Sequence, residues 1–225
     1  MLALIPARGG SKGIKDKNIR SFRGVPLLAH SIRHALDAGF RREDIVLSTD
    51  SEAYAAVGRE YGADVPFIRP EHLATDTAGS REVMLHAIDT LAAMGRVHDT
   101  ICLLQPTSPL RSPDDIVEAV RLYERHHPDM VVGVSLSGAN PYYNLFEPDA
   151  DGYLHISKGD GLITRRQDAP RVYEFNGAIY IISVEALRRG PLTRFERIIP
   201  LVMPPERSID LDTEEDWQRL DVQLF

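Results

Sequence analysis

The sequence has 225 residues, a formal net charge of −7 and a single cysteine, Cys102. The length suits one large α/β domain or a domain with an arm. The negative net charge argues against a nucleic-acid-binding surface. A single cysteine excludes an internal disulfide and a cysteine-rich metal site. No run approaches the ~18 apolar residues of a membrane span and residues 1–6 are too short for a signal-peptide core, so we expect a cytoplasmic enzyme.

Short apolar runs alternate with segments of helical period along most of the chain, a pattern typical of a mostly parallel sheet flanked by helices. We therefore expect an α/β, Rossmann-like fold. In chain order the pattern predicts strand 2–6, helix 26–39, strand 44–50, helix 51–62, strand 64–70, helix 81–95, a strand at the start of 100–111, helix 112–127, strands 129–137, 176–183 and 197–204, and helix 212–224. Ser51, Ser80 and Ser112 are the expected N-caps of three of these helices.

Residues 138–175 break this pattern, because they hold scattered Pro, Gly, Asp and aromatic residues without a sustained period. The segment is too long for a plain connection, so it is a protruding arm, a lid or disordered. We therefore divide the chain into an α/β catalytic domain, residues 1–137 and 176–225, and an inserted segment, residues 138–175.

The loop after the first strand combines glycines with positive charge. Glycines let the backbone approach an anion closely, and successive amide groups can form an anion-binding nest. The loop contains Gly9, Gly10, Gly13, Arg8, Lys12, Lys15, Lys17 and Asn18. Neither the Walker A pattern nor the dinucleotide fingerprint GxGxxG is present. We predict that this loop binds a triphosphate.

The segment "SIDLDTEEDW" near the C-terminus is acidic. Asp210 and Asp212 alternate, so on a strand both side chains would fall on one face. Two carboxylates without nearby His or Cys suit a hard cation such as Mg²⁺, bound together with substrate phosphates. The competing interpretation is that Asp212 caps the last helix and Glu215 closes a capping box.

Polar loops also follow other strands of the predicted sheet, where open α/β sheets bind ligands. Arg69 and residues 73–80 offer the amides, hydroxyls and charge that reading a pyrimidine would require, and Gln105 stands at a strand end. The eight histidines make no metal-ligand spacing, and no Ser/His/Asp set can be argued. Catalysis would therefore rest on positioning and charge neutralisation, as in nucleotidyl transfer.

At this point several motifs resemble those of the acylneuraminate cytidylyltransferases, the CMP-sugar-acid synthetases. They are "IPARGGSKGIKDKNI", "STD", "DTAGS", "LLQPTSPLR", "FNGAIYI" and "IDLDTEEDW", in the family's order and from end to end of the chain. The resemblance implies a nucleotidyltransferase fold and CMP transfer from CTP to the anomeric hydroxyl of a nine-carbon α-keto sugar acid. It also implies release of pyrophosphate, Mg²⁺ as cofactor with Mn²⁺ as a substitute, and a homodimer formed through the 138–175 arm.

The resemblance further implies roles for individual residues. Nucleotide binding falls to Ala7, Arg8, Gly9, Gly10, Ser11, Lys12, Asn18, Arg69, Ala78 and Ser80, of which the last three would read cytosine and its ribose. Arg8, Lys12 and Lys17 would stabilise the transition state, while Asp210 and Asp212 would bind Mg²⁺ and help activate the attacking hydroxyl. The sugar site would consist of Gln105, Arg166 on the sugar carboxylate, and Tyr180 on the dimer side.

Three positions depart from the family's common pattern: Lys15 replaces a Pro, Glu174 replaces an Arg, and Phe195 stands without an aromatic partner. The last two fall on the sugar side, so N-acetylneuraminic acid and legionaminic acid both stay open as substrates. The alternatives are a nucleotidyltransferase for another sugar acid, such as Kdo or pseudaminic acid, and a catalytically silent CTP-binding dimer.

Overall fold

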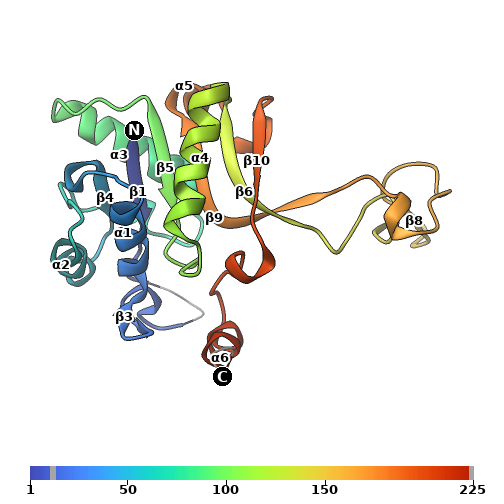
Figure 1. Ribbon diagram of the computed structural model, residues 1–225, viewed down its shortest axis with the longest axis horizontal. Helices are drawn as coiled ribbons and strands as arrows, with labels where there is room; N and C mark the ends of the chain where they lie inside the picture. The colour runs from blue at the N-terminus through green and yellow to red at the C-terminus, as the bar shows by residue number, and fades with distance from the viewer. Residues whose placement is uncertain (11–13, 223–225) are drawn as a thin grey trace.

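The computed structural model describes residues 1–10 and 14–222 (Figure 1). Within them the central sheet has six strands in the order β10-β6-β9-β5-β1-β4. Strand β9 is antiparallel to both of its neighbours, whereas the other neighbouring strands pair in parallel. The bounds are β1 (Leu2–Pro6), β4 (Ile45–Ser48), β5 (Thr100–Leu104), β6 (Met130–Leu136), β9 (Tyr173–Ser183) and β10 (Ile198–Val202). The mostly parallel sheet confirms the predicted fold class.

Helices cover both faces of this sheet, because alternate residues of its buried strands point to opposite sides. In β1, Ala3 and Ile5 pack with α1 (Leu27–Asp37), α2 (Glu52–Tyr61) and α4 (Pro113–His126). Leu2 and Leu4 pack instead with α3 (Ser80–Ala93) and α5 (Val184–Arg189). No helix in the described ranges has the length and apolar character needed to cross a membrane.

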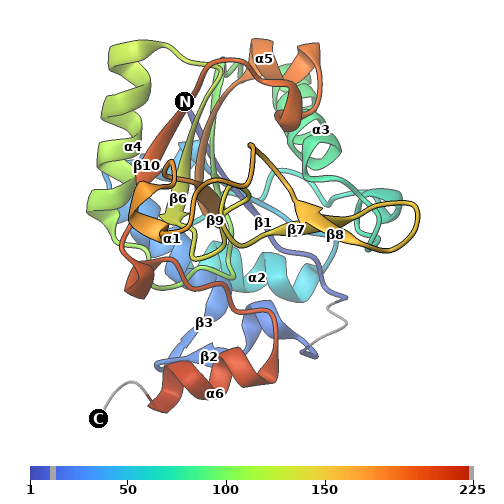
Figure 2. The ribbon, with the colours of Figure 1, turned by 90° about the vertical axis from the view of Figure 1, so that its right-hand side faces the viewer.

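The two ends of the chain meet in a third, smaller apolar cluster. The last helix, α6 (Glu214–Val222), lies beside the hairpin of β2 (Ser21–Phe22) and β3 (Val25–Pro26) (Figures 1 and 2). The rings of Phe22 and Trp217 meet edge to face with centroids 5.9 Å apart, and Leu211 is fully buried with them. This packing brings the segment before α6 next to the loop after β1.

Between β6 and β9 the chain leaves the sheet and extends away from it (Figure 1). This segment contains a small antiparallel hairpin of β7 (Phe146–Pro148) and β8 (Leu154–Ile156). Several of its apolar side chains are exposed, among them Phe146 at 52% and Leu154 at 65%. Because β9 runs antiparallel to β6, the projection starts and ends at the edge of the sheet where the parallel strands have their carboxyl ends.

Most of the predicted elements are present, but two expectations are wrong. Residues 64–70 form no strand beyond a single bridge between Asp64 and Val46, since Pro66 and Pro70 cannot donate to a ladder. Ser80 is the first residue of α3, and the N-cap, Gly79, makes no side-chain hydrogen bond. The predicted caps Ser51 and Ser112 are confirmed. The pattern did not predict α5 or the β2–β3 hairpin.

Candidate active site

The loops after β1, β5 and β10 leave the sheet at the carboxyl ends of parallel strands, where they enclose a cavity of about 350 Å³, here called the main cavity. Residues 69–83 form another of its walls. The lining consists of Pro6, Arg8, Lys17, Asn18, Arg69, Leu73, Thr75, Asp76, Ala78, Ser80, Val83, Leu103, Gln105, Pro106, Thr107, Asp210 and Asp212. The structure thus brings the basic loop, the polar strand-end loops and the acidic pair to one site.

A direct contact joins the basic loop to the acidic segment. Lys17 Nζ lies 3.0 Å from Asp212 Oδ1 and donates to the carbonyl oxygen of Leu211 at 2.9 Å. The Lys17 side chain is 11% exposed, whereas that of Asp212 is 67% exposed. The ammonium group is therefore held in place by protein on most sides, while the carboxylate remains open to a ligand.

Asp210 and Asp212 point to the same cavity although their segment is not the strand that alternation predicted. Leu211 between them is fully buried and donates its backbone N–H to Thr107 O at 2.8 Å, which turns both carboxylates outward. Asp210 is exposed at the cavity wall. Desolvation by the surrounding protein nevertheless raises the pKa of its carboxyl. A hydrogen bond from Thr107 opposes this effect, and the charge of Asp212 adds to it.

The competing interpretation of Asp212 as a helix cap is wrong. The capping box at the start of α6 joins Thr213 and Asp216: Thr213 Oγ1 accepts from Asp216 N at 3.2 Å, and Thr213 N donates to Asp216 Oδ2 at 2.8 Å. Thr213 and Asp216 have the same i, i+3 spacing as the expected pair, one residue further along. The Asp212 side chain is thereby left to the cavity and Lys17.

Two arginines of the main cavity differ in whether their guanidinium groups have acceptors. Arg8 Nη1 lies 2.5 Å from Asp76 Oδ1, in an ion pair whose side chains are about one-third exposed. Arg69 is 5% exposed, and its Nε and Nη2 have no hydrogen-bond acceptor among the described residues. Burial lowers the pKa of Arg69. Because a buried guanidinium without acceptors is costly, Arg69 is suited to a ligand that brings acceptor atoms.

The remaining residues predicted for the nucleotide fall into three groups. Asn18, Ala78 and Ser80 line the main cavity with Arg8 and Arg69. Ala7, Gly9 and Gly10 are outside its lining, and the Gly9 N–H donates to Asp50 Oδ1 at 2.8 Å, so this amide is not free for an anion. Ser11 and Lys12, with Gly13, lie outside the described residues.

A second cavity, also of about 350 Å³, adjoins the first, because Gln105 and Asp210 line both. Tyr180 of β9 lines it, together with Ser135, Glu174, Phe175, Asn176, Gly177 and Ser208. Arg166 lines neither cavity, because it lies in the projection between β6 and β9, at the start of a short 3₁₀ helix. Within one chain, the structure therefore brings Gln105 and Tyr180 together but leaves Arg166 apart.

Gln105 is held at the wall between the two cavities by a residue that the sequence did not single out as functional. Arg111 is only 1% exposed; its Nη2 donates to Gln105 O at 2.8 Å and its Nη1 to Ala178 O at 2.5 Å. Burial lowers the pKa of Arg111 to about 10, so the group stays charged at neutral pH. It joins the β5 exit loop to β9. Its position at the end of "LLQPTSPLR" gave no sign of burial.

Asp76 and Thr107 are two further cavity residues that sequence reasoning left without a role. Both stand in segments considered for ligand binding, "LATDTAGS" and "LLQPTSPLR". Their partners, Arg8 for Asp76 and Asp210 for Thr107, belong to other loops. A sequence pattern within one segment does not predict a contact with a different loop.

The donor set of the main cavity fits a divalent cation that binds together with phosphates. Among the described residues, no group of three or more His, Cys, Asp or Glu side chains is arranged to hold a metal ion, so the protein would supply two carboxylates, Asp210 and Asp212. Mg²⁺ is commonly held by one or two carboxylates, with its other ligands from phosphate oxygens and water. Desolvation is the main cause of the raised pKa of Asp210, and a cation there would offset the smaller contribution from the charge of Asp212.

Comparison with known proteins now decides the family. The sequence profile described as cytidylyltransferase matches residues 2–216. The chain belongs to the cytidylyltransferase family. It is 36% identical over 226 residues to the CMP-N,N′-diacetyllegionaminic acid synthase of Legionella pneumophila, covering 96% of this chain and 93% of that protein. This confirms the family resemblance found in the motifs.

Two further relatives extend the comparison. The N-acylneuraminate cytidylyltransferase of Escherichia coli is 35% identical over 220 residues, which cover 97% of this chain but 50% of that protein. The chain therefore spans about half the length of that relative. A solved CMP:2-keto-3-deoxy-manno-octonic acid synthetase complexed with CTP has a TM-score of 0.71 at 15% identity, covering 99% of this chain and 97% of that one. The last likeness shows a shared fold.

Proposed function

We propose that this protein transfers CMP from CTP to the anomeric hydroxyl of a nine-carbon α-keto sugar acid and releases pyrophosphate. The observation that carries the proposal is the contact between Lys17 and Asp212, at 3.0 Å. It joins a basic loop suited to phosphates to a carboxylate pair suited to a divalent cation, inside a cavity of a cytidylyltransferase-family protein.

In the proposed reaction the anomeric oxygen attacks the α-phosphorus of CTP. A new P–O bond forms, the bond from the α-phosphorus to the bridging oxygen breaks, and pyrophosphate leaves with that electron pair. Asp210 lines both the main cavity and the second cavity, so it would be placed to accept the hydroxyl proton as a general base. Arg8 and Lys17 would neutralise charge on the phosphates.

Charge balance in the main cavity supports a requirement for Mg²⁺. In the described lining, the positive charges of Arg8, Lys17 and Arg69 are matched by Asp76, Asp210 and Asp212. A triphosphate therefore needs additional positive charge. Mg²⁺ held by Asp210 and Asp212 would supply it and polarise the reacting phosphate, with Mn²⁺ as a substitute.

The second cavity is the proposed site of the sugar acid, because it shares Gln105 and Asp210 with the main cavity. Its described lining contains Glu174 and Asp210 but no Arg or Lys. The carboxylate of the sugar thus requires a cation from elsewhere. We propose that Arg166 of a second copy supplies it, in a homodimer formed through the 138–175 arm, whose exposed apolar side chains the partner would cover.

The acceptor is proposed to be N-acetylneuraminic acid or legionaminic acid. Relatives of similar identity carry the names of both substrate classes, at 35% for the N-acylneuraminate enzyme and 36% for the diacetyllegionaminic acid enzyme. Glu174 in the second cavity is a feature that would discriminate between acceptors, since it offers an acceptor group where an arginine would offer donors. We propose that the reaction takes place in the cytoplasm, where a nucleotide substrate would be available.

A pyrophosphate-release assay tests the proposal. The purified protein is incubated with Mg²⁺, with each of CTP, UTP, ATP and GTP, and with a panel of nonulosonic acids plus Kdo. We expect release only with CTP and one subset of the nine-carbon acids. Release with another base, or with Kdo alone, would overturn the assignment. CTP binding by calorimetry without turnover on any acceptor would instead indicate a silent CTP-binding dimer.

A further inference from the structure

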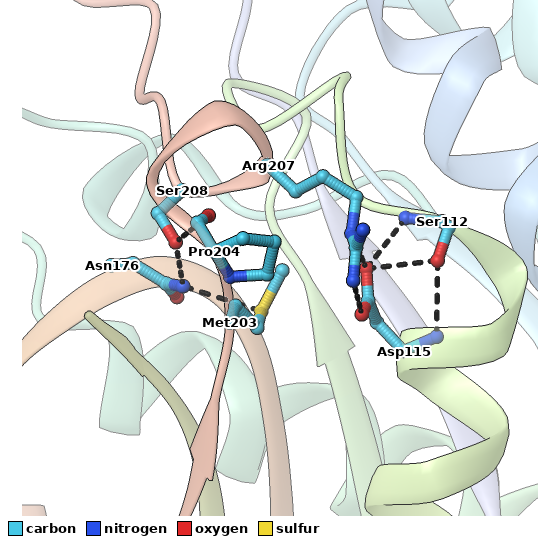
Figure 3. Close-up of polar contacts among 7 residues, drawn as sticks. All are labelled: Ser112, Asp115, Asn176, Met203, Pro204, Arg207 and Ser208. Carbon is cyan, nitrogen blue, oxygen red and sulfur yellow. Dashed lines mark hydrogen bonds and ion pairs between the residues drawn. The ribbon is translucent and has the colours of Figure 1, made fainter. Parts of the chain in front are cut away.

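Residues 203–208 form a short turn between β10 and the acidic segment, and Figure 3 shows Met203, Pro204, Arg207 and Ser208 of this turn. Met203 N donates to Val134 O at 2.8 Å, which continues the pairing with β6. Pro204 and Pro205 follow, and Ser208 Oγ donates back to Pro204 O at 2.9 Å. The two prolines and this internal bond limit the conformations of the turn. Only Ile209 separates it from Asp210.

An arginine of this turn binds a buried carboxylate at the start of α4. Arg207 Nε and Nη2 donate to the two carboxylate oxygens of Asp115, each at 2.9 Å, in the bidentate arrangement drawn in Figure 3. The same carboxylate accepts from Ser112 N at 2.8 Å and from Ser112 Oγ at 2.9 Å, and so closes the capping box of α4. The position of Arg207 is thereby tied to a rigid helix terminus.

The surroundings of Asp115 favour its ionised form. Burial acts to raise the pKa of its carboxyl, but hydrogen bonds from Arg207 and Ser112 outweigh burial and hold the pKa below its ordinary value. Asp115 is 7% exposed. Removing Arg207 would therefore leave a buried charge with fewer partners.

A second tether holds the next residue of the turn. Asn176 of β9 donates from Nδ2 to Ser208 Oγ at 3.0 Å and to Met203 Sδ at 3.2 Å (Figure 3). Its Oδ1 accepts from Ala178 N at 3.1 Å. Gly133 makes room for this amide, since a Cβ there would lie 2.7 Å from Asn176 Oδ1. Arg207 and Ser208 are thus anchored to α4 and β9, immediately before the acidic pair.

We infer that Arg207 and Asp115 are positioning residues, which set where Asp210 and Asp212 can hold a divalent cation. Neither lines the main cavity, so their effect passes through residues 208–209. The inference rests on the proposed function, because it assumes the cation site there. Substituting a residue that orients metal ligands from outside the coordination shell typically weakens metal binding by roughly 10- to 100-fold.

The test compares Arg207→Gln with Arg121→Gln as a matched control. Arg121 also pairs with a carboxylate on α4, Glu118, at 2.6 Å, but both side chains are exposed and belong to one helix face. Mn²⁺ affinity is measured by electron paramagnetic resonance of the free ion, with a non-hydrolysable CTP analogue present. We expect about 10-fold weaker Mn²⁺ binding for Arg207→Gln and no change for Arg121→Gln. Affinity for the analogue in EDTA should stay within about twofold for both.

A double variant distinguishes loss of the contact between Arg207 and Asp115 from general destabilisation of the protein. Asp115→Asn alone should weaken Mn²⁺ binding, and combining it with Arg207→Gln should add little, because partners in one interaction are not additive. Should Arg207→Gln not fold, Arg207→Lys replaces it, since lysine keeps the charge but loses the bidentate geometry. Wild-type Mn²⁺ affinity in the folded Arg207 variant would overturn the inference, whatever its thermal stability.

Asp212→Ala distinguishes failure of the inference from failure of the proposed function. If Asp212→Ala loses Mn²⁺ binding while Arg207→Gln retains it, the positioning role alone is wrong. If Asp212→Ala binds Mn²⁺ like the wild type, the proposed cation site is wrong and the inference fails with it. We expect both variants to lose affinity, Asp212→Ala by more.

Discussion

Lys17 and Asp212 are 195 residues apart in the chain, yet Lys17 Nζ lies 3.0 Å from Asp212 Oδ1. The contact depends on the third apolar cluster, in which Leu211 and Trp217 pack against the hairpin that follows the basic loop. Folding of the C-terminal segment onto the N-terminal loop therefore completes the proposed nucleotide site.

The first prediction concerns Asp212 itself. Asp212→Ala should lower kcat by at least about 100-fold, because it removes one of two proposed cation ligands. The fold should be retained, since the side chain is 67% exposed. The matched control is Glu214→Gln, which breaks another pair between the same segments, Arg20 to Glu214 at 2.6 Å, outside the cavity lining. Steady-state kinetics in Mg²⁺ and thermal melting check both, and equal activity losses in the two variants would contradict the assignment.

The second prediction concerns Arg166. Arg166→Ala should raise the KM for the sugar acid by about 10-fold or more and leave that for CTP almost unchanged, because a charge-assisted contact with a carboxylate is worth roughly 1.5–3 kcal/mol. Arg165→Ala is the control, since Arg165 pairs with Asp168 in its own chain, at 2.7 Å. A larger effect on CTP than on the sugar would refute the placement.

A mixing experiment asks from which copy Arg166 acts. Co-expression of Arg166→Ala with Asp212→Ala gives heterodimers in which one site combines an intact Asp212 with an intact arm of the partner. The Asp212→Ala homodimer should be inactive and the Arg166→Ala homodimer should show the raised KM for the sugar acid, whereas the purified heterodimer should recover the wild-type KM in its one functional site. A heterodimer that keeps the raised KM would show that Arg166 acts within its own chain.

The third prediction concerns sugar selectivity. Glu174 lines the second cavity, and its carboxylate accepts long hydrogen bonds from Ser135 Oγ at 3.4 Å and Ser137 Oγ at 3.5 Å. A carboxylate favours a substituent that donates hydrogen bonds. Glu174→Gln should therefore change the ratio of kcat/KM between two nonulosonic acids by about 10-fold without changing the KM for CTP. An unchanged ratio would contradict this role, and Glu185→Gln on the distant α5 is the control.

The fourth prediction concerns pH and stability. Burial, aided by the charge of Arg111, lowers the pKa of His34 to about 3. In the unfolded chain the pKa is ordinary, about 6.5, so between these values the unfolded state binds more protons and stability falls as pH falls. The contribution of one such group is at most about 1.4 kcal/mol per pH unit. The free energy of unfolding, measured with urea at pH 7, 6 and 5, should fall less steeply toward low pH in His34→Gln than in the wild type. The same dependence on pH in both proteins would contradict this prediction.

Local sequence signals were sufficient where a cap and a hydrophobic period agreed. Helix α4 shows this, since Ser112 is the expected N-cap before a periodic apolar face and forms a capping box with Asp115. Residues 64–70 show the limit, because their apolar content suggested a strand while Pro66 and Pro70 removed the donors that a strand needs.

The acidic segment shows why a site can be predicted in position but not in detail. The same capping pattern fits two pairs of residues, Asp212 with Glu215 and Thr213 with Asp216. Spacing alone therefore cannot tell which pair forms the capping box. Burial of Leu211 decides, because it turns Asp212 toward the cavity and leaves the cap to Thr213. The pairings of Arg111 with Gln105 O and of Arg207 with Asp115 were likewise not predictable, since they depend on which loops the fold brings together.

The most direct test of the central claim is a crystal structure of the protein with a non-hydrolysable CTP analogue and Mn²⁺, using anomalous scattering to locate the ion. We expect an anomalous peak in contact with Asp210 and Asp212, with the triphosphate between them and the loop that carries Arg8 and Lys17. A nucleotide or an ion bound outside this cavity, with the cavity itself empty, would show that the proposed site is wrong.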